Sequence, residues 1–243
     1  MELIKAEFLP EAWEKSIVAV WEKGSKIYTE YGEYSLDLPI AIRVEKPFSE
    51  PRIHLKGVVV GKLKQLFEYV DEVLEGVNDW RVGKDWHYTY HERLFNYTTP
   101  DGTVIDQIKY VVEKLSKTPY SRRAQAITWM PWKDINADSP PCVQRLWFRV
   151  IDEKLALHVH MRSNDAMKAA FMNMYALTEL QRLVAKSIGV EPGYYLHIAD
   201  SYHIYERDWK WAEKFVKQVK EGSSKRLWMT TGKYMRIACR KLQ

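Results

Sequence analysis

The chain has 243 residues, of which 46% are apolar and 28% are charged, the balance of a soluble globular protein. With only two cysteines and no uncharged apolar run near the ~20 residues that span a bilayer, a collagen-like fibre, a disulfide scaffold and a membrane-spanning protein are excluded. The net charge of +5 is a mild basic excess, which suits nucleic acid or one small anionic ligand equally well. The N-terminus lacks the apolar stretch of a secretory signal, so we expect a cytoplasmic protein with Cys142 and Cys239 as free thiols.

Helical and extended patterns alternate along the first half of the chain. Residues 10–23 place Trp13, Ile17 and Val20 on one face, which predicts an amphipathic helix. Residues 33–44 alternate and predict a strand, in which Pro39 indicates a sheet edge or a bulge. The same reasoning predicts helices over residues 60–76 (capped by Gly76) and 105–116, a turn over 98–103 and a strand over 123–130.

A β-hairpin is the clearest pattern of the second half. The strand-like run at 147–151 is followed by a turn and by alternating residues 155–161, with Leu157 and Val159 on one face and His158 and His160 on the other. A helix over about 165–187, an extended stretch over 193–205, a helix over 208–219 and a basic, weakly periodic last twenty residues follow. Without repeats or linkers, the pattern predicts a single α+β domain over residues 1–243.

Cys142 is the first candidate for chemistry. Two prolines precede it and restrict its backbone, and Arg145 follows three residues later. Positive charge close to a thiol lowers its pKa and favours the nucleophilic thiolate. A single cysteine is also commonly a small buried apolar residue, so the residue by itself leaves catalysis and packing open.

Basic and imidazole side chains gather near predicted strand ends. Arg122 and Arg123 precede one strand, and Arg162 and Ser163 close another. Guanidinium groups and a hydroxyl suit a phosphate, although solvated surface charge explains them equally well. The HxH pair at 158–160 shares one strand face, as metal ligands can, but no third ligand has suitable spacing and we expect no metal.

Six short motifs follow one another between residues 88 and 206. They are YHERLFNYTTPDGTVIDQI (90–108), TPYSRR (118–123), PPC (140–142), MRSND (161–165), FMN (171–173) and DSYHIY (200–205). In this order and spacing they resemble the motifs of the thymidylate synthase family, and the sequence after the cysteine is most similar to its archaeal-type branch. The resemblance implies a thymidylate-synthase-like mixed sheet packed with helices.

The resemblance also implies an activity, the reductive methylation of dUMP to dTMP by transfer of a one-carbon unit to C5. Cys142 would add to C6, because C5 is a poor nucleophile until C6 is saturated. The other implied catalytic residues are Tyr90 (removal of the C5 proton through water), Asn173 (the base edge) and Asp165 (beside pyrimidine and cofactor). The implied substrate-binding residues are Arg162, Ser163, Arg122 and Arg123 for the phosphate, and His203 and Tyr205 for the sugar 3′-hydroxyl. In the family the paired arginines serve the partner's site, which argues for a homodimer, whereas the altered termini leave a monomer open.

Asn173 bears on the choice of base. An amide has both a donor and an acceptor, as the uracil edge requires. Family members that hydroxymethylate dCMP place an acidic residue there, because cytosine presents an amino donor. Asn173 therefore favours dUMP, and a dUMP or dCMP hydroxymethylase is the first alternative. A non-catalytic nucleotide- or RNA-binding protein on the same fold is the second, supported by the basic charge.

Several positions depart from the family pattern. The nucleophile is followed by Val143 instead of His, and Trp147 stands where a Gln is usual. No N-terminal phosphate-binding arginine and no closing C-terminal tail match the pattern. Lys23 or Lys26 could replace that arginine, and Glu68, Asp71 or Glu72 could be the proton-relay glutamate. The expected one-carbon donor is therefore methylenetetrahydrofolate or a tetrahydromethanopterin-type carrier, with dUMP and the carrier as partners and neither membrane nor nucleic acid.

Overall fold

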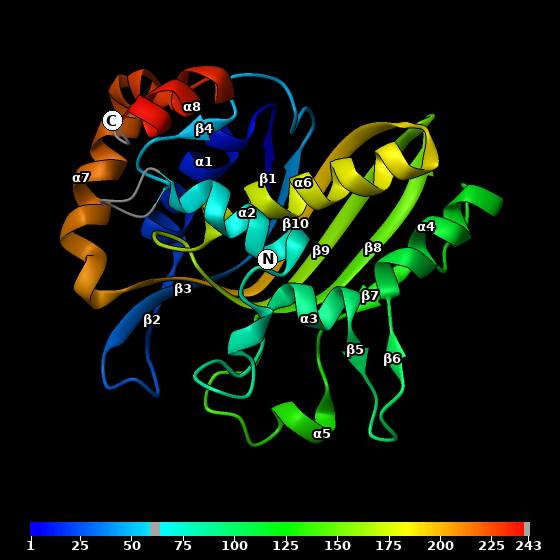
Figure 1. Ribbon diagram of the computed structural model, residues 1–243. Coiled ribbons are helices and arrows are strands. Elements are labelled where there is room, and N and C mark those ends of the chain that lie inside the picture. The colour runs from blue at the N-terminus through cyan, green and yellow to red at the C-terminus, as the bar shows by residue number, and fades with distance from the viewer. Residues whose placement is uncertain (59–63, 241–243) are drawn as a thin grey trace.

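The computed structural model describes residues 1–58 and 64–240, and in this part of the chain seven strands form one mixed sheet (Figure 1). Strands β1 and β3 are parallel, as are β9 and β10, and the other neighbouring pairs are antiparallel. The sheet confirms the predicted α+β class. Its order is β1 (Glu2–Ala6), β3 (Tyr34–Val44), β10 (Glu191–Tyr205), β9 (Lys154–Asp165), β8 (Val143–Ile151) and β7 (Gln125–Ile127), and β2 (Ser25–Tyr28) pairs with β3.

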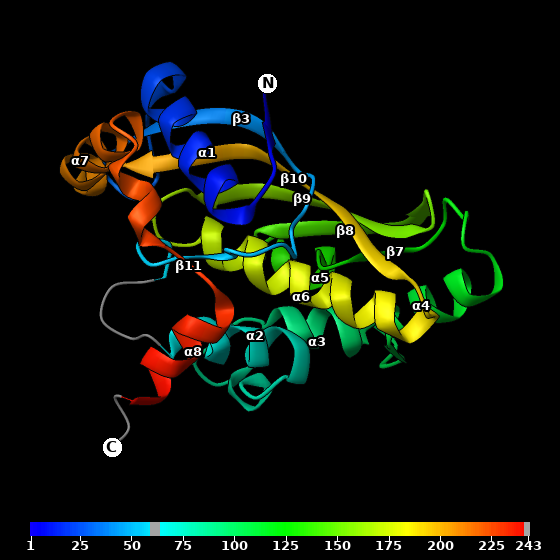
Figure 2. The ribbon, with the colours of Figure 1, turned by 90° about the horizontal axis from the view of Figure 1, so that it is seen from above.

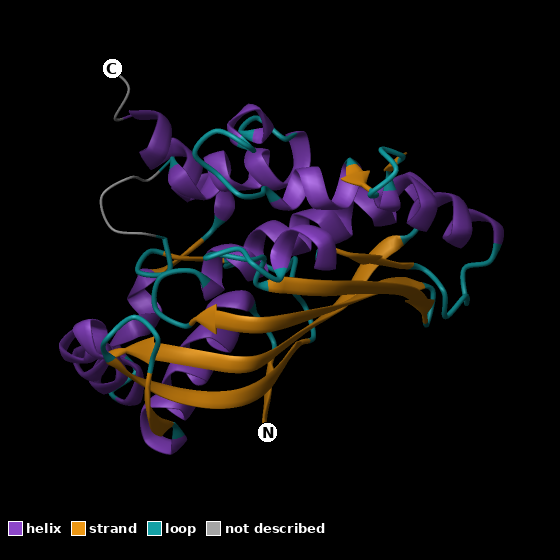
Figure 3. Ribbon diagram, turned by 90° about the horizontal axis from the view of Figure 1, so that it is seen from below, coloured by secondary structure: helices purple, strands orange, loops and turns teal. Residues whose placement is uncertain are grey.

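Helices α1 (Leu9–Lys23) and α6 (Ala170–Ile188) pack on the sheet and on each other. The rings of Trp13 and Phe171 meet there, with centroids 5.8 Å apart. Figure 2 shows both helices against the central strands, and Figure 3 shows most helices on one side of the sheet. The other helices are α2 (Gln65–Glu75), α3 (Tyr90–Phe95), α4 (Gln107–Lys117), α5 (Pro131–Asp134), α7 (Trp209–Lys220) and α8 (Thr231–Arg240). No helix in the described ranges is long and apolar enough to cross a membrane.

The β8–β9 hairpin forms as the sequence predicts. Its turn contains Asp152 and Glu153, both with positive φ, and the strands pair in antiparallel register. On β9, Leu157 and Val159 are fully buried under the helices, while His158 is only half-buried on the opposite face. The alternation in the sequence therefore correctly predicted which face of β9 is buried in the core.

Pro39 lies inside β3 without breaking the sheet. On one side of it, β10 carries a bulge, because Ala199 pairs with Ile40 whereas Tyr202 pairs with Leu38. On the other side, β2 pairs up to residue 37 and β1 begins at residue 40. The missing N–H thus falls where the ladder is already interrupted. The bulge reading is confirmed, and the edge reading is wrong because β3 is flanked on both sides.

The starts of two predicted helices differ from the structure, and the helices α3, α5 and α8 were not predicted. The helix expected from residue 165 begins at Ala170, because the Asp165 carboxylate accepts the backbone N–H groups of Met167 and Lys168 in a turn. The helix expected from residue 60 is described only from Gln65, since residues 59–63 lie outside the described part. It ends at Gly76, whose φ of +65° favours glycine.

The last twenty residues contain α8 and a short strand, although their periodicity was too weak to predict either. Strand β11 (Trp228–Met229) pairs with β4 (Ile53–His54). The Trp228 indole N–H donates to the buried Glu14 carboxylate at 2.8 Å, and Tyr234 of α8 is fully buried. Long-range contacts of this kind leave no periodic signal in the sequence.

Candidate active site

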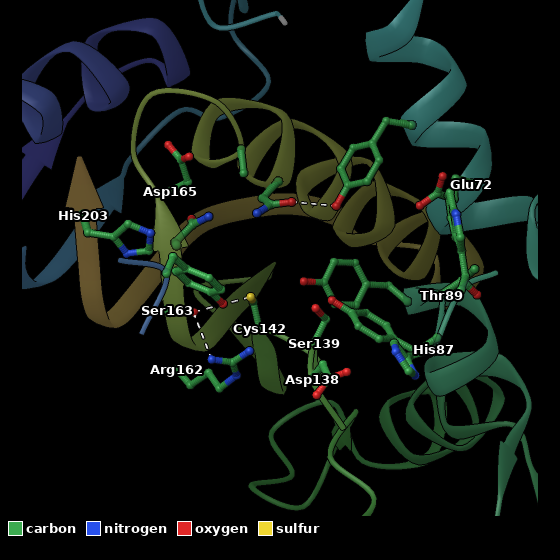
Figure 4. Close-up of a pocket in the computed structure, with 18 of the residues that line it drawn as sticks. Glu72, His87, Thr89, Asp138, Ser139, Cys142, Arg162, Ser163, Asp165 and His203 are labelled. Atoms are coloured by element: carbon green, nitrogen blue, oxygen red, sulfur yellow. Dashed lines mark hydrogen bonds between the residues drawn. The ribbon is translucent and has the colours of Figure 1, made fainter. Parts of the chain in front are cut away.

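A cavity of about 790 Å³ opens where β9 and β10 end. These parallel neighbours bring their carboxyl ends to one edge of the sheet, so that Asp165 pairs with His203. Figure 4 shows how Cys142, Arg162 and Ser163 lie at one side of this cavity. Of the predicted site residues, those that line it are Tyr90, Cys142, Arg162, Ser163, Asp165, Asn173, His203 and Tyr205.

Cys142 precedes β8 and is a free, half-buried thiol. Its Sγ lies 3.5 Å from the Ser163 Oγ, and Ser163 also accepts a hydrogen bond from the Arg162 guanidinium at 3.3 Å. The guanidinium donates to the carbonyl oxygens of Pro140 at 2.7 Å and Pro141 at 3.0 Å. The two prolines therefore do more than restrict the backbone, because their carbonyls hold the cation of β9 beside the thiol.

The residue that supplies positive charge near the thiol was predicted wrongly. Arg145 is exposed on β8 and is not among the residues of the cavity wall. Its charge acts on His158, where it helps burial to lower the imidazole pKa. Arg162 takes the place that sequence proximity assigned to Arg145, because strand pairing brings β9 alongside the start of β8.

Two tyrosines and an amide form the wall above the thiol. The Tyr69 hydroxyl of α2 donates to Oδ1 of Asn173 on α6 at 2.6 Å. The Tyr90 hydroxyl accepts the backbone N–H of Val143, the residue after Cys142, at 3.3 Å. Burial raises the pKa of both phenols well above the ordinary value, so both stay protonated near neutral pH. Tyr69 was missed because nothing local distinguishes it from a core residue of an amphipathic helix.

Asp165, His203 and Tyr205 form the end of the cavity at β9 and β10. Burial raises the pKa of Asp165, and burial raises the pKa of Tyr205 to about 12. The His203 ring packs edge-on against Tyr205 with centroids 4.7 Å apart, and its Nδ1 lies 3.3 Å from the Ser201 Oγ. The Ser201 hydroxyl in turn donates to the Asp37 carboxylate of β3, so Asp37 and Ser201 together orient the His203 imidazole. The sequence did not indicate either residue.

The opposite wall comes from α2 and from the loop that leads into α3. It includes Glu72, Asp85, Trp86 and His87. Burial raises the pKa of Glu72, whose carboxylate accepts a hydrogen bond from Asn78 at 2.8 Å. Of the three carboxylates considered for a proton relay, Glu72 is the one that reaches the cavity. Helical periodicity could not show which of the three carboxylates faces the cavity, because the sequence does not show which elements pack around α2.

The remaining predicted cations lie elsewhere. Arg122 and Arg123 are exposed on the connection from α4 to β7 and do not line this chain's own cavity. Lys23 pairs with Glu2 at 2.7 Å, and the Lys26 ammonium lies 4.0 Å from the centre of the Tyr34 ring. The lysine candidates for the phosphate site are therefore wrong. For the arginines, a role in a partner's site stays a prediction.

The histidine pair on β9 is engaged by protein groups. His158 Nε2 lies 2.8 Å from the Tyr194 hydroxyl, and His160 Nε2 lies 3.0 Å from both Asp200 oxygens. Within the described ranges no three His, Cys, Asp or Glu side chains gather as metal ligands do. Cys239 belongs to α8, and its side chain lies outside what the structure describes.

Comparison with known proteins identifies the family. The family model described as "Thymidylate synthase" matches residues 14–241. The chain is 33% identical over 218 residues to the "Putative thymidylate synthase" of Methanosarcina mazei, covering 89% of this chain and 95% of that protein. It is 34% identical over 224 residues to the protein of the same name from Methanocaldococcus jannaschii, covering 88% of this chain and 96% of that protein. These relatives are archaeal, as the sequence after the cysteine predicted. The chain belongs to the thymidylate synthase family.

Proposed function

We propose that this protein is a methyltransferase that converts dUMP to dTMP, with Cys142 as the nucleophile. The observation that supports this most directly is the convergence of a free thiol, the Arg162–Ser163 pair and the Asn173 amide on one cavity. At about 790 Å³ it lies in the size range of small-molecule sites. A protein that only bound a nucleotide would have no use for a thiol at this position.

In the proposed first step the Cys142 thiolate adds to C6 of the pyrimidine. The C5=C6 double bond is lost, and negative charge develops on the C4 oxygen. Asn173 stabilises that charge, because Tyr69 already holds its Oδ1 and leaves the amine to donate. Arg162, held by the proline carbonyls, binds the 5′-phosphate together with Ser163.

Proton transfer is assigned to Tyr90 and Glu72. A water bound to the Tyr90 hydroxyl takes the C5 proton and passes it to the Glu72 carboxylate, and the Val143 N–H positions that hydroxyl. Glu72 carries protons to and from this wall, because its raised pKa allows it to hold a proton closer to neutral pH than an exposed carboxyl. His203 and Tyr205 hold the sugar 3′-hydroxyl, and Asp165 lies where pyrimidine and carrier meet.

The wall formed by Glu72, Asp85, Trp86 and His87 fits a reduced pterin, the ring system that both candidate carriers share. Trp86 offers an aromatic face that the Arg81 guanidinium backs at 4.2 Å, and the two carboxylates can accept from pterin N–H groups. When bound, the carrier supplies the one-carbon unit and the reducing equivalents. Both methylenetetrahydrofolate and a tetrahydromethanopterin-type carrier fit the acidic wall. The mass of the covalent adduct formed with each carrier distinguishes them.

The phosphate site gives a reason for a homodimer. Arg162 is the one Arg or Lys among the described residues that line the cavity, against the carboxylates of Glu72, Asp85, Asp138 and Asp165. A dianionic phosphate would be better matched with the partner subunit's Arg122 and the partner's Arg123 in place. The proposed setting is the cytoplasm, with dUMP, the carrier and a second copy of the chain as partners.

Intact-protein mass spectrometry after incubation with 5-fluoro-dUMP tests the proposal. Fluorine at C5 cannot leave as a proton, so a competent enzyme is trapped as a covalent adduct. Each carrier is added separately, and Cys142→Ser is the control. We expect the mass of nucleotide plus one carrier on the wild type alone, which identifies the donor. If dUMP and the matching carrier yield 5-hydroxymethyl-dUMP instead of dTMP, the protein is a hydroxymethylase; absence of any adduct would favour a nucleotide-binding protein.

A further inference from the structure

Two buried amides line the cavity, and the protein holds the carbonyl oxygen of each. Asn173 is 6% exposed and accepts from Tyr69. Asn164 on β9 is 2% exposed, and its Oδ1 lies 3.0 Å from His197 Nε2. Both carbonyl oxygens are thus engaged by protein donors, which leaves both NH₂ groups free to donate elsewhere.

The orientation of Asn164 is set by a short chain of buried groups. The Nδ1 of His197 lies 2.9 Å from the Tyr195 hydroxyl. His197 is fully buried, and burial lowers its pKa to about 3, so the ring is neutral and has one donor and one acceptor. Because Asn164 Oδ1 can only accept, Nε2 carries the proton and Tyr195 donates to Nδ1. The two hydrogen bonds therefore run in one direction, with Tyr195 donating to His197 and His197 donating to Asn164.

The Nδ2 amines of the two amides lack a protein acceptor. Within residues 1–58 and 64–240, no hydrogen bond runs from either Nδ2 to a protein oxygen. Neither Nδ2 is among the fully buried polar atoms without a partner, so both amines are open to the cavity and available to a ligand. Two such donors on one cavity wall suit a ligand with two carbonyl oxygens, and uracil has them at C2 and C4.

We propose that Asn164 is a second base-reading residue that donates from Nδ2 to the C2 carbonyl of the pyrimidine, and that His197 is the positioning residue that orients it. The inference rests on the proposed function. Asn164 lies on β9 between Ser163, assigned to the phosphate, and Asp165, which pairs with His203, assigned to the sugar 3′-hydroxyl, so we assign its amine to the carbonyl on the sugar side of the base. C2 is the carbonyl next to the N1 atom that bears the sugar, whereas C4 adjoins C5 and faces Asn173.

Thio-substituted nucleotides test this assignment. Sulfur is a weak hydrogen-bond acceptor, so 2-thio-dUMP removes the C2 acceptor and 4-thio-dUMP removes the C4 acceptor. Affinities of the whole protein are measured by calorimetric titration. We expect Asn164→Ala to weaken dUMP binding about tenfold and 4-thio-dUMP binding to the same extent, but 2-thio-dUMP binding less than about threefold.

His197 is tested with a matched pair of variants. His197→Gln keeps an N–H donor near the position of Nε2, whereas His197→Phe keeps the ring and removes both nitrogens. We expect His197→Phe to follow the Asn164→Ala pattern with the thio ligands and His197→Gln to follow the wild type. Tyr195→Phe, which only removes a hydroxyl, should lose part of the preference for dUMP over 2-thio-dUMP.

Equal weakening of dUMP and 2-thio-dUMP by Asn164→Ala would overturn the inference, since that is the effect of a general structural change. A penalty that disappears with 4-thio-dUMP instead would overturn the assignment to C2. Wild-type protein that forms no adduct with 5-fluoro-dUMP and binds no dUMP would overturn the proposed function together with this inference. An intact adduct with unchanged thio preferences would overturn this inference alone.

Discussion

The hydroxyl of Tyr69 and the Oδ1 of Asn173 lie 2.6 Å apart, which links α2 to the first turn of α6 across the top of the cavity. In the proposed dUMP complex, this bond decides which end of the Asn173 amide faces the base. Without it, the amide could rotate and present its oxygen to the amino group of cytosine as readily as its amine to the carbonyl of uracil. We therefore expect base specificity at this position to depend on both Tyr69 and Asn173.

Tyr69→Phe should therefore reduce the preference for dUMP over dCMP by about five- to tenfold while leaving adduct formation at Cys142 possible. The measurement is the ratio of the two dissociation constants. Tyr28→Phe is the control, because Tyr28 is exposed and does not line the cavity. An unchanged ratio in Tyr69→Phe would show that the amide is oriented by other means.

Stability should depend on pH through His197. Its folded pKa of about 3 lies below the ordinary value of 6.5, so the unfolded chain binds the proton first as pH falls. The free energy of unfolding should then be insensitive to this group above about pH 6.5 and decrease below it, by up to about 1.4 kcal/mol per pH unit. Urea unfolding of wild type and His197→Gln between pH 7 and pH 4 measures it, and the variant should lack this part of the slope. Parallel curves would contradict the prediction.

The helix α3, which contains Tyr90, also contains one partner of a buried ion pair. Arg93 donates to both Asp134 oxygens at 2.8 and 2.9 Å and to the Thr128 carbonyl at 2.9 Å, and Arg93 and Asp134 are almost fully buried. Removing one partner strands the other charge in the interior. Arg93→Leu should cost about 3–5 kcal/mol in the free energy of unfolding.

The control for this change is Lys15→Met, which breaks an exposed ion pair with Glu11. Exposed pairs contribute about 0–1 kcal/mol, so little loss is expected there. Chemical denaturation of both variants gives the comparison. Equal losses would mean that Arg93 and Asp134 are solvated in solution.

Subunit complementation tests the proposed role of Arg122 and Arg123. The double variant Arg122→Ala/Arg123→Ala and the variant Cys142→Ser should each be nearly inactive. Once mixed and allowed to exchange, half of the dimers are mixed and one of their two sites has both a thiol and intact arginines, so about a quarter of the wild-type activity should return. Activity that stays at the level of the single variants would argue that the arginines do not cross an interface.

Local rules were enough for much of the fold. Alternation along residues 155–161 predicted the buried face of β9, and the left-handed glycine at residue 76 predicted the end of α2. Local rules failed where residues far apart in the sequence determine whether an element forms or where it begins. The start of α6 depends on how the Asp165 carboxylate caps a turn, and α8 depends on contacts of Trp228 and Tyr234 with segments far away in the sequence.

For the site, ordered motifs in the sequence determined the family and most of the residues that line the cavity, Cys142 among them, because the motifs keep a constant order and spacing. Only the tertiary structure decided that Glu72 reaches the cavity, that Arg162 and not Arg145 lies beside the thiol, and that Tyr69 and His197 orient the two amides. These relationships join residues on different strands and helices. Their hydrogen bonds tolerate displacements of only a few tenths of an ångström, and the donor and acceptor reach these positions only once the sheet and helices have packed.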